Sequence, residues 1–154
     1  MYQWALLLHL VGAILFFAGL AVAAVGQAAA RRRARPTEIA VLLGTARWGV
    51  LMVGLGTILA VGFGFWLVDL TAYGFDGWVV ASLALLAFAL GAGGAGGQAP
   101  KRARRLAERL AREGDEPSAE LELLLHDRVS DALSWAGAAA AIAVLFLMVW
   151  KPGA

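Results

Sequence analysis

The fold of this chain is decided by the stretch WALLLHLVGAILFFAGLAVAAVGQAAARRRAR, residues 4–35. Between residues 4 and 30 only His9 and Gln27 carry a strongly polar side chain, and four arginines then follow within five residues. A helix needs about 20 apolar residues to cross the hydrocarbon core of a bilayer, and basic residues beside such a helix stay in the cytoplasm. The stretch therefore predicts a transmembrane helix that starts outside the cell and ends inside it.

Three further apolar runs follow the first (4–30), at about residues 39–68, 78–95 and 129–150. All but one of the 13 Lys and Arg residues fall within residues 31–47 and 101–128, which follow the first and the third run. In a chain that crosses the bilayer four times, these two segments lie on the same side of the membrane. Lys151, after the fourth run, is the exception. Charge confined to alternate connections is typical of a chain threaded through a bilayer with its basic loops inside. We therefore predict an all-α membrane protein, a single domain over residues 1–154. Its four transmembrane helices form an antiparallel up-down bundle with the N-terminus and C-terminus both outside.

The tryptophans agree with this topology, because a Trp ring is apolar while its N–H seeks water or a headgroup. Two layers result, with Trp4, Trp66, Trp78 and Trp150 at the predicted outer interface and Trp48 and Trp135 near the inner one.

Composition narrows the function classes. Charged residues make up 16% of the chain and hydrophobic residues 61%, whereas a typical soluble domain has about 25% charged residues. The absence of cysteine excludes a disulfide framework and a thiolate metal site. We find no HExxH motif, no intramembrane carboxylate pair and no serine beside a plausible base, so no catalytic residue or metal site is predicted. We expect a multi-pass protein of the cell inner membrane, with the bilayer and not nucleic acid as its surroundings.

The third loop is the one sizeable polar segment, a cytoplasmic amphipathic region over about residues 100–128. Residues 100–113 predict a basic amphipathic helix with Leu106 and Leu110 on one face, and an acidic stretch follows at 115–122. Two arrangements are open: the basic helix packs against the acidic segment as a hairpin, or it lies on the headgroups. Anionic lipid headgroups or a protein are the expected partners of this basic loop.

Small residues recur four apart, which places them on one helix face and lets helix backbones approach closely. They are Gly56, Ala60 and Gly64 in the second span and Ala87, Gly91 and Ala95 in the third. The pattern predicts helix packing within the monomer. The alternative is a face for self-association into a homo-oligomer or a larger membrane complex.

His9 lies in the outer third of the first span, where an ionisable residue usually faces the bundle and has a partner. The simplest interpretation is a neutral His that donates one hydrogen bond to a neighbouring helix. The alternative is a cofactor site, because imidazole can ligate haem. Met148 falls at roughly the same depth, and a His/Met pair can hold haem. No cofactor is predicted on the leading interpretation, and haem is the alternative.

A structural ion pair is predicted near the inner interface. Arg47 in the second span lies at the depth of Asp131 at the start of the fourth, and Asp127 lies one turn further out. A link between Arg47 and one of these carboxylates would satisfy both charges and fix the relative height of the two helices.

Two segments carry a family resemblance. Residues 8–13, Leu-His-Leu-Val-Gly-Ala, are followed by Phe-Ala-Gly at 17–19, and the chain ends with Leu-Met-Val-Trp-Lys-Pro at 147–152. This start and finish resemble those of an uncharacterised family of predicted four-span bacterial membrane proteins. The first helix is more distantly similar to the copper-resistance D membrane proteins and to the haem-binding protoporphyrinogen oxidase. In the oxidase the first-helix His is thought to bind haem, which the resemblance places at His9.

These observations favour a small inner-membrane protein that has no recognisable active site. It would act through helix packing, as a structural or accessory subunit of a homo-oligomer or of a larger membrane complex. A haem-binding redox protein that uses His9 is the first alternative. A small transporter or channel is the second.

Overall fold

The computed structural model describes residues 1–70 and 76–152, and helices make up nearly all of this part of the chain. The helices are α1 (Tyr2–Ala30), α2 (Pro36–Leu70), α3 (Gly77–Gly96), α4 (Gln98–Glu113), α5 (Ala119–Leu125) and α6 (Arg128–Trp150). Helices make up 88% of the described residues, which contain no strand. The predicted all-α class is confirmed.

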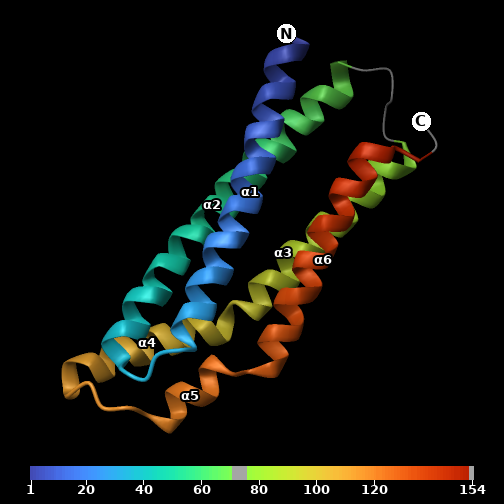
Figure 1. Cartoon of the computed structure of the whole chain (residues 1–154). Coiled ribbons are helices and arrows are strands. Elements are labelled where there is room, and N and C mark those ends of the chain that lie inside the picture. The colour runs from blue at the N-terminus through green and yellow to red at the C-terminus, as the bar shows by residue number, and fades with distance from the viewer. Residues whose placement is uncertain (71–75, 153–154) are drawn as a thin grey trace.

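Four helical segments are long and apolar enough to cross a membrane. They are α1, α2, the nearly continuous α3–α4 segment Gly77–Glu113, and the segment Ala119–Trp150 that contains α6. The apolar runs predict four spans, and the described residues contain four helical segments of sufficient length and hydropathy. The start of α1 and the end of α6 lie at the same end of the molecule (Figure 1).

The spans form two pairs, since α1 packs mainly on α2 and α3 mainly on α6 (Figure 1). Glycines every seven residues make the α1–α2 contact: Gly12, Gly19 and Gly26 on α1, and Gly49 and Gly56 on α2. A Cβ atom added to Gly56 would lie 2.5 Å from the Phe16 nitrogen and 2.7 Å from the Gly12 oxygen. Only glycine therefore permits this backbone approach, which favours dispersion contacts in a bilayer.

The backbones of α3 and α6 also approach each other closely at glycines. A Cβ atom on Gly137 of α6 would lie 2.9 Å from the Ala89 oxygen, and one on Gly96 of α3 would lie 2.7 Å from the Ser130 oxygen. Between the two pairs, by contrast, the contact is made by a bulky side chain: Phe16 of α1 is buried against Ala89 of α3 and Ala141 of α6.

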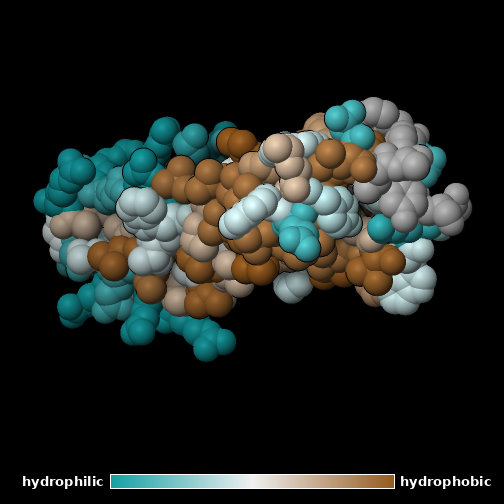
Figure 2. All heavy atoms as spheres, turned by 90° about the horizontal axis from the view of Figure 1, so that it is seen from above, coloured by the Kyte–Doolittle hydropathy of each residue, from teal (hydrophilic) through white to brown (hydrophobic). Residues whose placement is uncertain are grey.

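The end of the molecule that carries the arginine-rich segments 31–47 and 101–128 is closed by a small apolar core. We call this the basic end; it comprises residues 31–47 and 98–128, and hydrophilic residues gather there (Figure 2). Its core combines residues from α1, α2, α4 and α5: Ala30, Ile39, Leu43, Ala103, Leu106, Ala107, Leu121 and Leu125. Asp115 ties the α4–α5 connection to α2, since it accepts hydrogen bonds from the Thr37 N–H at 2.7 Å and hydroxyl at 2.9 Å.

This core decides between the two arrangements of the third loop. The apolar face of α4, with Ala103, Leu106 and Ala107, is buried against α2 and α5. That face is consequently occupied within the protein and does not rest on lipid. The packing resembles the predicted hairpin, although α2 contributes more of the contact with α4 than α5 does.

Candidate functional site

A cleft of about 380 Å³ separates the two helix pairs, on the side of Phe16 away from the basic end. It exists because each pair is closed by glycines, whereas the pairs touch each other through the Phe16 ring and diverge beyond it (Figure 1). All four spans line the cleft, and its volume falls within the range of ordinary ligand pockets, about 300–1,000 Å³. The lining is mostly aliphatic and aromatic and includes Leu6, His9, Phe17, Val61, Leu86 and Met148.

His9 is the distinctive polar residue of the cleft. Its Nδ1 donates a hydrogen bond to the backbone carbonyl of Ala60 on α2, at 2.7 Å. Because a carbonyl can only accept, Nδ1 carries a proton, and in the neutral ring Nε2 has a lone pair. No hydrogen-bond partner of Nε2 occurs among residues 1–70 and 76–152.

The predicted small residues of α2 explain why the imidazole fits. Gly56 forms part of the seam with α1, and Ala60 supplies the accepting carbonyl. Gly64, one turn further on, leaves room for the ring, since a Cβ atom there would lie 3.2 Å from His9 Nδ1. The simplest interpretation of His9 predicts one hydrogen bond to a neighbouring helix, and the bond to Ala60 is such a bond. The same bond orients the ring for a ligand at Nε2.

Other polar groups in the cleft are held by local bonds or lie at its mouth. The Ser82 hydroxyl donates to the Trp78 carbonyl at 2.8 Å, and the Thr57 hydroxyl donates to the Val53 carbonyl at 2.8 Å. Lys151, at the end of α6, lies 5.8 Å from the centre of the Trp78 ring. The described lining of the cleft thus presents the oriented imidazole of His9, the Met148 thioether, the Lys151 ammonium and the Tyr2 phenol among mainly apolar side chains.

The cleft offers an imidazole and a thioether as donors for a metal centre. The described residues contain no group of three or more His, Cys, Asp or Glu side chains that could hold a metal ion. Haem needs only one or two axial ligands from the protein, and imidazole and thioether are both used. His9 and Met148, on opposite helix pairs, line the same cleft.

The structure corrects the predicted ion pair. Asp131 binds Arg31, at the end of α1, and each side chain is about one third exposed (31% and 33%). Arg47 lies on an exposed face of α2, because the neighbouring Ala46 and Gly49 turn toward α1. Asp127 is the N-cap of α6, and its carboxylate accepts the Ser130 N–H at 2.8 Å. The sequence could not single out Arg31, since three more arginines stand beside it.

The predicted small residues of α3 also lie elsewhere than expected. Ala87, Gly91 and Ala95 are exposed, and no heavy atom lies within 4 Å of a Cβ atom built on Gly91. The face of α3 that packs on α6 is the other one, which includes Ala89 and Gly96. This smooth, exposed face is free for lipid or another helix.

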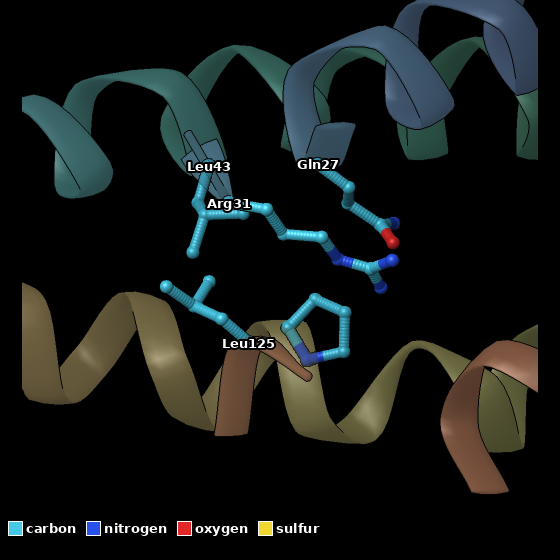
Figure 3. A pocket seen from close by; sticks show the side chains of 5 residues that line it. Gln27, Arg31, Leu43 and Leu125 are labelled. Carbon is cyan, nitrogen blue, oxygen red and sulfur yellow. The ribbon is translucent and has the colours of Figure 1, made fainter. Parts of the chain in front are cut away.

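A second, much smaller void lies at the basic end, between Gln27, Arg31, Leu43, Pro100 and Leu125 (Figure 3). The side chains of Arg31 and Gln27 extend side by side along it (Figure 3). Its volume of about 10 Å³ is close to the room that one water molecule needs, so it is not a ligand site.

Fold and site together define a helical integral membrane protein with a cleft between two helix pairs. The chain belongs to the family described as predicted integral membrane protein DUF2269, whose model matches residues 4–152. This is a family of unknown function, and it confirms the predicted resemblance to an uncharacterised family of integral membrane proteins. No curated protein and no solved structure matches the chain.

Proposed function

We propose that this protein binds haem in the cleft between the helix pairs, with His9 as an iron ligand. One observation carries the proposal: the Ala60 carbonyl fixes the His9 ring so that Nε2 keeps its lone pair, in a cleft that Met148 also lines. Metal-ligating histidines usually donate their second ring N–H to a carbonyl or carboxylate, which sets the tautomer and raises ligand basicity.

Each group that lines the cleft then has a role in binding haem. His9 supplies the imidazole, Met148 supplies a thioether from the opposite pair, and the apolar lining excludes water from the ring. Lys151 places a cation at the mouth of the cleft, where it complements the carboxylates of a porphyrin. Haem, when bound, supplies one-electron redox chemistry.

The test is the absorption spectrum of the full chain, purified from cells supplied with haem. We expect a Soret band in the wild type, its loss in His9→Ala, and a shifted spectrum in Met148→Leu. The control is His126→Ala, since His126 is exposed at the basic end, outside the cleft. A colourless wild type would overturn the proposal, and so would a Soret band that survives His9→Ala.

A second candidate function is a non-catalytic role as a structural or accessory subunit that acts through helix packing. The exposed face of α3, with Ala87, Gly91 and Ala95, favours it, because small residues let another helix approach closely. Gly91→Leu should then reduce self-association or co-purification of a partner in mild detergent. Gly62→Leu is the matched control, because Gly62 also faces open space but lies on α2. Equal association in both variants would contradict this role.

The transporter or channel alternative receives less support from the lining. Thr57 and Ser82 bond to their own helices, so the described walls of the cleft offer few groups that could replace the hydration shell of an ion.

A further inference from the structure

The basic face of α4 is the strongly charged surface that the cleft proposal leaves unexplained. Lys101, Arg105, Arg109 and Arg112 follow one another at spacings of four, four and three residues, which sets them in one line along the helix. All four are exposed. We call this line the α4 stripe.

The α4 stripe lies opposite the packed face of its helix. Ala99, Ala103, Leu106 and Ala107 are the buried residues of α4, and they face α2 and α5. At 100° per residue, the stripe falls on the other side of the helix axis. Its cations therefore point away from the protein.

The stripe has no acidic partners within the described part of the chain. The ion pair on α4 joins Arg104 to Glu108, beside the stripe, and the other ion pairs join Arg33 to Glu38 and Arg31 to Asp131. Although acidic residues follow α4, Asp115 is engaged with Thr37. Since none of the four stripe cations forms an ion pair within the described residues, they are available to an external anion.

The position of α4 along α2 indicates where that anion lies. α4 packs against α2 at Ile39 and Leu43. Trp48 marks the predicted inner interface. At 1.5 Å per residue, Ile39 and Leu43 lie about 7–14 Å from Trp48 along the axis of α2. The headgroup layer is roughly 5–8 Å deep on each side of the hydrocarbon core. Since Lys and Arg side chains reach several ångströms along apolar surface, the stripe lies within reach of the inner headgroups.

We propose that the α4 stripe is a binding site for anionic phospholipid headgroups of the leaflet predicted to face the cytoplasm. The buried apolar face of α4 cannot insert into the bilayer, so the attachment is electrostatic and uses the stripe alone. Arginines suit a phosphodiester, because the planar guanidinium can donate two parallel hydrogen bonds to phosphate oxygens. This attachment is independent of any ligand in the cleft.

The experiment titrates the purified full chain, in mild detergent, with short-chain phosphatidylglycerol and separately with phosphatidylcholine, and counts bound lipid by native mass spectrometry. The test variant is Arg105→Gln/Arg109→Gln. The matched control is Arg32→Gln/Arg35→Gln, which removes two exposed cations from the same end but from the connection between α1 and α2, and keeps Arg47 beside Trp48 at the predicted inner interface. Circular dichroism of each variant verifies that the helices are intact.

The wild type should bind phosphatidylglycerol more tightly than phosphatidylcholine. Each stripe cation contributes about fivefold to the binding constant, so the test variant should bind phosphatidylglycerol roughly 30-fold more weakly. The control variant should stay close to the wild type, and Arg105→Lys/Arg109→Lys should retain most of the preference. Equal affinity for the two lipids would overturn the proposal, as would equal losses in the test and control variants. The proposal would also be overturned if the stripe bound an acidic protein and the chain showed no preference between the two lipids.

Discussion

The α1–α2 seam offers the sharpest test of how this fold is held together. We predict that Gly56→Ala destabilises the protein, whereas Gly54→Ala, two residues away on the same helix, does not. The two substitutions are chemically identical, and both add one methyl group to α2. They differ only in surroundings, because a Cβ atom on Gly54 has no heavy atom within 4 Å.

The magnitude follows from the geometry at Gly56. The nearest atoms to its Cβ atom would be the Phe16 nitrogen at 2.5 Å, the Gly12 oxygen at 2.7 Å and the Phe16 Cα at 2.8 Å. All three belong to the α1 backbone, so no side chain can turn away. Ordinary contact begins near 3.4 Å, and α1 must therefore move by roughly 1 Å, at a cost of about 1–3 kcal/mol.

The control should change in the opposite direction. Replacing an exposed helical glycine with alanine stabilises a helix by about 0.5–1 kcal/mol, because the unfolded chain loses entropy. The two variants should therefore differ by about 1.5–4 kcal/mol in the free energy of unfolding. Unfolding by a denaturing detergent, followed by circular dichroism in mixed micelles, measures this difference. Equal stability of Gly56→Ala and Gly54→Ala would refute the close backbone contact of α1 and α2.

Two further predictions concern the basic end. Leu121→Ala should cost about 2–5 kcal/mol of stability, because Leu121 is 2% exposed in the apolar core. Leu123→Ala should cost little, because Leu123 is 75% exposed. Thermal unfolding compares the two variants, and similar losses of stability would contradict the packing of α5. Asp127→Ala should cost about 1 kcal/mol through loss of the α6 N-cap, while Asp127→Asn should keep most of the stability because its amide oxygen can still accept the Ser130 N–H. An Asp127→Asn variant as unstable as Asp127→Ala would indicate that the carboxylate charge, and not the cap, matters.

Some features of the site could be anticipated from single residues. His9 was expected to face a neighbouring helix, and it does, because an imidazole in an apolar span needs a hydrogen-bond partner. Its acceptor could not be named, since every residue of the second span carries a carbonyl. The α3 residues Ala87, Gly91 and Ala95 show the same limit: small residues also occupy the other face of that helix, and spacing alone does not say which face is packed.

The sequence by itself determined the class of protein and its four spans. That information is local, because a bilayer requires about 20 apolar residues per helix and holds basic loops on one side, whatever the helices pack against. Only the tertiary structure decided which helices pair, that Arg31 rather than Arg47 meets Asp131, and that a cleft separates the pairs. The physical reason lies in the backbone. Glycines let two helices approach closely wherever they happen to face each other, while the Phe16 ring holds the two pairs apart, and neither effect is visible until the helices are placed in space.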